Sequence, residues 1–175
     1  MKQKIPFVFH LMHVLFYIVF IGLSIKAGVL VISFIISLAV SAQAASNLYM
    51  GIDLSELFKF DKYHYISIMV LAIIIAMLKA SIAMMAVGVA SGFNIDKPFN
   101  TITTHMITGI SRLALFTGIL AIIAQEYIKW LSTKNISVPL DMGGQEILFF
   151  AGVIYMLAKV FEKGVELQSE NELTV

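Results

Sequence analysis

The stretch Tyr65–Val89 reads YISIMVLAIIIAMLKASIAMMAVGV, and it decides the fold class of this chain. Lys79 is its only charged residue, and most of the remaining residues are apolar. A helix that crosses the roughly 30 Å apolar core of a bilayer needs about 20 such residues. The stretch therefore predicts a transmembrane helix.

The composition of the whole chain agrees with a membrane location. Of its 175 residues, 59% are apolar and 13% are charged. A soluble domain averages roughly 45–50% apolar and about 25% charged residues, and a chain this short could not bury the excess. The net charge of +1 gives no bulk attraction for nucleic acid, and the absence of cysteine excludes disulfides, thiolate metal sites and cysteine nucleophiles. We therefore expect one integral membrane domain, residues 1–175, and exclude a soluble or disordered protein.

Three other segments are also apolar enough to cross a bilayer. Together with residues 65–89, we expect spans at about residues 7–27, 102–127 and 146–161, an outer segment at about residues 29–64 and a tail at residues 162–175. The predicted fold class is all-α. It is a polytopic membrane helical bundle of four transmembrane helices, with an outer amphipathic helix or helix extension.

The N-terminal apolar run of roughly 35 residues is too long for one crossing and too short for two. Lys26 marks an edge for the first span, and Ser33, Ser37 and Ser41 follow on one helix face. We therefore expect residues 29–45 to form an amphipathic helix that continues outward or lies on the membrane surface, with a fifth span as the alternative. The run exceeds the core of about 7–15 residues of a signal peptide, which favours an uncleaved anchor.

Small residues follow one face of the second span at intervals of four. They are Ala72, Ala76, Ala80 and, after Met84, Gly88. Such spacing lets helices approach closely in lipid. We expect this stripe to pack within one chain, and a homodimer through Ala72, Ala76, Ala80 and Gly88 is the alternative.

Two basic residues in the predicted spans are candidates for function. Lys79 lies near the middle of the second span, and Arg112 lies at similar depth in the third. We expect their long stems to bring both charged heads to the inner headgroups. A lipid or anionic-ligand site is the alternative. A small transporter is less favoured, because no carboxylate is placed at that depth in the spans.

Three of the four histidines are expected on one side of the membrane: His10, His13 and His105. Axial histidines from two facing helices can hold a haem or a metal, so a bis-histidine haem site is a minor alternative. The motifs of zinc proteases, serine hydrolases and phosphate-binding loops are absent from the sequence. We therefore expect no enzyme activity and no cofactor.

The C-terminal tail combines acidic residues with an apolar end. Glu166, Glu170 and Glu172 precede Leu173 and Val175. This pattern suits docking to a basic protein partner, with the two apolar residues as anchors. A solvated tail without a partner is the alternative.

Three segments resemble a bacterial membrane family, domain-of-unknown-function family 2975. Residues 159–175, KVFEKGVELQSENELTV, match its typical ending, F-x-x-G-x-x-L/I-Q-x-E-N-D/E-L-T-V. Residues 94–100, NIDKPFN, resemble its loop between the second and third spans. Residues 51–57, GIDLSEL, followed by Phe60-Asp61, resemble the outer segment of its Bacteroidetes-type members.

The resemblance implies four spans in the bacterial inner (plasma) membrane, with both termini on the cytoplasmic side. It implies no chemistry. Members of this family are often encoded beside a small helix-turn-helix regulator of the Cro/CI type. We therefore expect the chain to sequester such a regulator through its tail and to release it when the outer segment reads a signal.

Overall fold

The computed structural model describes residues 7–39, 45–46, 48, 51–93 and 98–172. This part of the chain is all-helical, with α1 (Phe7–Ala39), α2 (Ser55–Phe60), α3 (Lys62–Gly92), α4 (Thr101–Ser132) and α5 (Gly144–Glu172). Four helices, α1, α3, α4 and α5, are long and apolar enough to cross a membrane. The predicted all-α bundle with four such helices is confirmed, and the chain fits a multi-pass membrane protein.

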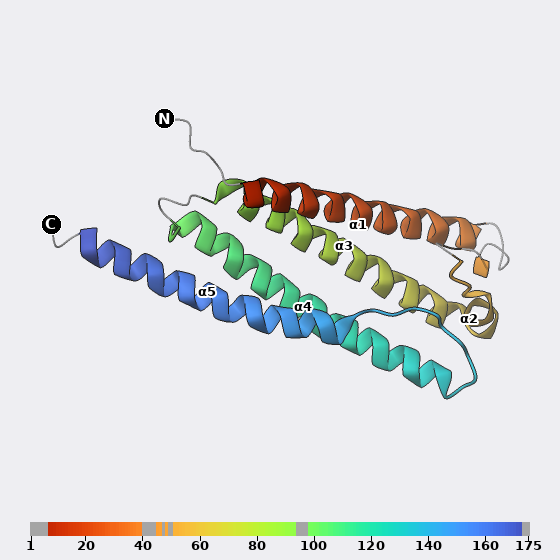
Figure 1. Cartoon of the computed structure of the whole chain (residues 1–175). Helices are drawn as coiled ribbons and strands as arrows, with labels where there is room; N and C mark the ends of the chain where they lie inside the picture. The colour runs from red at the N-terminus through yellow and green to blue at the C-terminus, as the bar shows by residue number, and fades with distance from the viewer. Residues whose placement is uncertain (1–6, 40–44, 47, 49–50, 94–97, 173–175) are drawn as a thin grey trace.

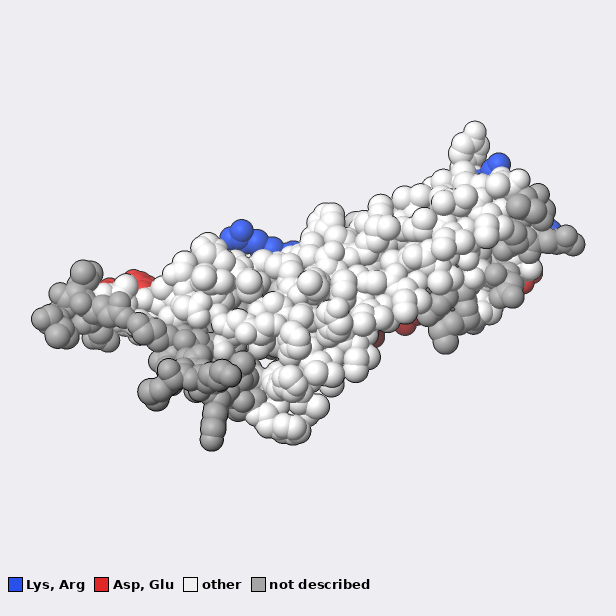
Figure 2. All heavy atoms as spheres, turned by 90° about the horizontal axis from the view of Figure 1, so that it is seen from above, with Lys and Arg blue, Asp and Glu red and all other residues white. Residues whose placement is uncertain are grey.

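The long helices pack in the order α1, α3, α4 and α5 (Figure 1). α3 contacts both α1 and α4, whereas α5 packs on α4 and, within the described residues, has no contact with α1. The first and last described residues lie at one end of the bundle, here called the terminal end. The opposite end, which holds α2, is called the α2 end. Seen from the α1 side, the surface is largely uncharged, as expected for a lipid-facing helix (Figure 2).

α1 supports one of the alternatives left open for residues 29–45, a helix that continues outward from the first span. It continues through Lys26 to Ala39, a length of 33 residues or about 50 Å. One glycine inside a helix costs only about 1 kcal/mol, so Gly28 does not end it. The Ser33 hydroxyl donates to the Leu48 carbonyl at 3.0 Å, so the serine face packs inward instead of facing headgroups. Residues 40–44, which include Ser41, lie outside the described residues.

The small-residue stripe of α3 packs within the chain. Ala72, Ala76 and Ala80 are buried in the bundle. A Cβ placed on Gly88 would lie 3.6 Å from the sulfur of Met106 on α4. The stripe therefore makes its contacts within the chain, with the three alanines buried and Gly88 half-buried.

Ala45, Leu48 and residues 54–58 pack at the α2 end of the bundle. Leu54, Leu57 and Tyr65 are fully buried there. The Tyr65 hydroxyl lies 2.5 Å from the Ser37 hydroxyl, and its ring meets the Phe58 ring edge-on at 4.9 Å between centroids. The described residues of the expected outer segment that follow α1 are therefore packed against α1 and α3 at this end.

Two acidic residues shape the backbone beside α2. The Asp61 carboxylate accepts from the backbone N–H groups of Tyr63 and His64, which caps the start of α3. Asp53 accepts from the backbone N–H of Ser55 at 2.8 Å, and this bond holds the pKa of the exposed Asp53 carboxyl below its usual value. Both carboxylates thus have local structural partners.

α5 begins partway along α4 and packs closely on it there (Figure 1). A Cβ on Gly144 would lie 2.7 Å from the backbone nitrogen of Ile122, and one on Gly118 would lie 3.0 Å from the backbone nitrogen of Leu148. Glycine at these positions permits the close approach. α5 then continues to Glu172, so the predicted tail is helical over residues 162–172.

Candidate functional site

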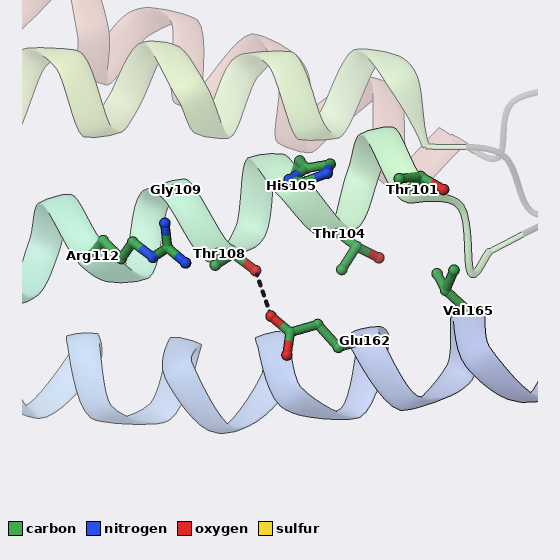
Figure 3. A pocket seen from close by; sticks show the side chains of 8 residues that line it. All are labelled: Thr101, Thr104, His105, Thr108, Gly109, Arg112, Glu162 and Val165. Atoms are coloured by element: carbon green, nitrogen blue, oxygen red, sulfur yellow. Dashed lines mark hydrogen bonds between the residues drawn. The ribbon is translucent and has the colours of Figure 1, made fainter.

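A cleft of about 350 Å³ lies between α4 and α5 near the terminal end (Figure 3). It is lined by Thr101, Thr104, His105, Thr108, Gly109 and Arg112 of α4 and by Glu162 and Val165 of α5. Thr101, His105, Thr108 and Arg112 recur every three or four residues, so they share one face of α4. The sequence thus places a polar face of α4 along the cleft that α4 forms with α5.

Arg112 supplies the cleft with an exposed guanidinium. Figure 3 shows its side chain extending toward Thr108 and the terminal end. This direction follows from the geometry of an α-helix, in which side chains tilt toward the helix N-terminus. Within the described residues, Arg112 makes no hydrogen bond or salt bridge, so its five N–H donors can serve a ligand.

Thr104 supplies a second donor that has no partner. The residue is only 7% exposed, and its hydroxyl oxygen has no hydrogen-bond partner in the described structure. Leaving a buried hydroxyl unpaired costs about 1–3 kcal/mol. An acceptor atom bound in the cleft would remove this cost.

Glu162 is the acidic side chain of the cleft, and it is already engaged. One carboxylate oxygen accepts from Lys159 at 2.7 Å, and the other accepts from the Thr108 hydroxyl at 3.4 Å. Arg112 and Lys159 together carry two positive charges against this one carboxylate. The positive N-terminal end of α4 begins at Thr101 and adds to the same field, so the cleft favours an anion.

Lys79 lies in a different place from Arg112. Its ammonium donates to the Met142 carbonyl at 2.9 Å and lines a smaller cavity of about 80 Å³ that Lys26 and Asp141 also line. α3 and α4 run in opposite directions, so the same N-terminal tilt sends Lys79 toward the α2 end. The expectation that both heads reach one side is wrong, and the structure does not bring Lys79 and Arg112 together.

The histidines expected on one membrane side lie in the first turns of α1 and α4, which both begin at the terminal end, but they contact different helices. His13 bonds to the Ser91 hydroxyl of α3 at 2.7 Å, whereas His105 lines the α4–α5 cleft. α1, which carries His10 and His13, has no contact with α4 in the described structure. No group of three or more His, Asp or Glu residues able to hold a metal occurs among the described residues. His10 and His13 therefore have different neighbouring helices from His105.

The predicted docking residues lie on and beyond the end of α5. Glu166 pairs with Lys163 at 2.7 Å, and Glu170 also has an interaction partner. Leu167 is exposed between them. The side chain of Glu172, and Leu173 and Val175 as a whole, lie outside the described structure.

Sequence reasoning identified Arg112 but missed Thr104, Thr108 and Glu162 as its neighbours. The signal for Thr108 was the four-three-four spacing that joins Thr101, His105, Thr108 and Arg112. The position of Glu162 depends on how α5 is aligned with α4, and no local pattern fixes that alignment.

No known protein family, curated protein or solved structure matches this chain. The resemblance to family 2975 therefore stays a prediction from the quoted residues.

Proposed function

We propose that this membrane protein binds an anionic ligand in the α4–α5 cleft and acts by binding, without catalysing a reaction. The observation that carries the proposal is that the Arg112 guanidinium and the Thr104 hydroxyl line one cleft and that neither has a hydrogen-bond partner among the described residues. We further propose that the protein lies in the bacterial plasma membrane with the terminal end on the cytoplasmic side.

The donor set suits a phosphate or carboxylate group. A guanidinium can form two parallel hydrogen bonds with either group, which gives strength and orientation. The Thr104 hydroxyl and the His105 ring add donors from the same helix. The offset of Glu162 by Lys159 limits repulsion of the incoming anion.

Titration of the full-length protein with inorganic phosphate in a neutral detergent tests the proposal. We expect the melting temperature to rise with phosphate concentration, and to rise with its logarithm once the concentration is well above the Kd. Arg112→Gln removes a charge-assisted bond of about 1.5–3 kcal/mol and should weaken binding roughly 10- to 100-fold. Arg112→Lys should retain part of the affinity, because the charge remains and the two-pronged geometry is lost.

Lys134→Gln is the matched control for loss of one positive charge. Lys134 lies at the α2 end, with its ammonium 5.9 Å from the centre of the Trp130 ring. Its substitution should leave phosphate binding unchanged. Equal loss in Lys134→Gln and Arg112→Gln would reduce the effect to net charge, and absence of any phosphate effect on the unaltered protein would reject the proposal.

A second candidate function is docking of a small helix-turn-helix regulator, as the family resemblance implies. The observation that favours it is the reach of α5. Gly164 packs against the Phe99 ring beside the start of α4, and α5 continues beyond this point to Glu172 (Figure 1). The last turns therefore project from the bundle as a helix with exposed Glu166, Leu167 and Glu170.

A pull-down from native membranes separates this candidate from anion binding. The full-length chain should recover the regulator, and a chain lacking residues 166–175 should not. Arg112→Gln should still recover it, because Arg112 lies in the cleft and not on the projecting turns. If the regulator's target transcripts stay unchanged after the deletion, the docking function is wrong.

A further inference from the structure

We infer that the ligand of the cleft is an anionic phospholipid, with its phosphate at Arg112 and its acyl chains on the exposed face of α4. This inference rests on the proposed function and names the class of its ligand. The inference rests on one face of α4, which is polar near the terminal end and apolar beyond Arg112.

The polar face that lines the cleft continues as an apolar face in the direction of the α2 end. After Arg112 the same three- and four-residue spacing reaches Phe116, Ile119 and Ile123. These side chains are 57%, 48% and 58% exposed, respectively. The face is therefore polar over its first turns and apolar and uncovered beyond Arg112, as a lipid requires.

α5 shows the same change on its side of the cleft. Lys159 and Glu162 are charged, whereas Tyr155 and Met156, one turn earlier, are 52% and 63% exposed. The Lys159 ammonium lies 5.6 Å from the centre of the Tyr155 ring. Both helices thus place charge toward the terminal end and apolar side chains toward the bundle centre.

The length of the apolar face matches one leaflet of a bilayer. Arg112 and Ile123 are 11 positions apart, a rise of about 16 Å along the helix. Half of a roughly 30 Å apolar core is about 15 Å. A phospholipid whose phosphate is held by Arg112 would therefore place its acyl chains along Phe116, Ile119 and Ile123.

Three probes distinguish a lipid from a soluble anion. They are dioctanoyl phosphatidate, sn-glycerol 3-phosphate, which has the same headgroup without chains, and dioctanoyl phosphatidylcholine, which has chains on a zwitterionic headgroup. Each is titrated into the full-length protein at a fixed concentration of neutral detergent. Each buried methylene contributes about fourfold in affinity, so phosphatidate should bind at least tenfold more tightly than glycerol 3-phosphate.

Two variants assign the parts of the lipid to the two parts of the face. Arg112→Gln should weaken phosphatidate and glycerol 3-phosphate alike. Phe116→Ser should weaken phosphatidate about five- to tenfold and leave glycerol 3-phosphate unchanged. Ile36→Ser, which removes an exposed apolar side chain from α1, is the matched control and should change neither.

The outcomes separate this inference from the proposed function. Equal affinity for phosphatidate and glycerol 3-phosphate would overturn the lipid and retain the anion site. Equal affinity for phosphatidate and phosphatidylcholine would overturn the lipid inference, because the chains alone would then explain binding. Binding of neither phosphate probe would overturn the inference and the proposed function together.

Discussion

Each end of the bundle holds one hydroxyl and one basic side chain that lie in or beside the bundle, and only those at the α2 end have hydrogen-bond partners within the described residues. At the α2 end, the Tyr65 hydroxyl meets the Ser37 hydroxyl, and the Lys79 ammonium meets the Met142 carbonyl. At the terminal end, the Thr104 hydroxyl has no partner among the described residues, and the Arg112 guanidinium likewise makes no hydrogen bond there. Both ends belong to the same apolar helices, so composition does not explain the difference.

The difference shows how a basic residue inside a membrane span should be judged. Lys79 and Arg112 are equivalent in the sequence, since each is the lone cation at the centre of an apolar run. Their partners separate them, because Lys79 holds the 133–143 connection against α3, whereas Arg112 faces a cleft. Lys79 therefore has a structural contact within the chain, and the proposed ligand-binding role is confined to Arg112.

Among these variants, Tyr65→Ala should cause the largest loss of unfolding free energy. Such a loss would show that packing at the α2 end contributes strongly to the stability of the bundle. Tyr65 is fully buried, and truncating a buried aromatic side chain costs about 3–5 kcal/mol. His105→Ala, at the exposed terminal end, should stay within about 0.5 kcal/mol of the unaltered protein. Unfolding in mixed detergent micelles measures both values. Similar losses for the two variants would contradict the contrast between the ends.

Gly118→Val tests the close part of the α4–α5 contact. The added side chain meets the backbone of Leu148, and overpacking of this kind costs about 1–3 kcal/mol. Gly152→Val is the matched control, because nothing lies within 4 Å of a Cβ at that position. The same unfolding experiment should show a loss for Gly118→Val alone. If Gly118→Val is as stable as Gly152→Val, α4 and α5 do not approach closely at Gly118.

Lys79→Met and Arg112→Met should separate structure from binding. Removing the Lys79 donor should cost about 1–2 kcal/mol of unfolding free energy, because the Met142 carbonyl loses its bond. Phosphate affinity should be unchanged in that variant. Arg112→Met should show the reverse, with stability kept within about 0.5 kcal/mol and phosphate affinity lost. A loss of phosphate affinity in Lys79→Met would show that the two cations act together.

Hydropathy predicted the fold class because a spanning helix must be apolar over most of its length. The stretch Tyr65–Val89 lies inside α3 for this reason. Lys26 was predicted to mark the edge of the first span, and the helix continues past it, because a single lysine and a single glycine cost less than the intrahelical hydrogen bonds that continue through them. Composition alone does not show whether the cost of these residues or the gain from the intrahelical hydrogen bonds is larger.

The candidate site was predicted only in part, because its residues come from two helices. Arg112 could be found as a charge in an apolar run, and the polar face of α4 could be found from its spacing. The contribution of Glu162 required the offset start of α5, which depends on Gly118 and Gly144 allowing close contact with α4. The direction of Lys79 required the antiparallel course of α3 and α4.

Thr104→Val and Thr117→Val provide the finest comparison, with effects of about 1 kcal/mol and opposite sign. Both threonines are buried on α4, but the Thr117 hydroxyl donates to the Leu113 carbonyl at 2.7 Å and the Thr104 hydroxyl has no partner in the described structure. The substitution keeps the shape and removes the hydroxyl, so it should destabilise at Thr117 and stabilise the ligand-free protein at Thr104. In saturating phosphate, Thr104→Val should lose this advantage, because the unaltered hydroxyl then has an acceptor. Unfolding with and without phosphate measures all four values. An equal loss at both positions without phosphate would mean that Thr104 already has a partner and that the cleft needs no ligand to satisfy it.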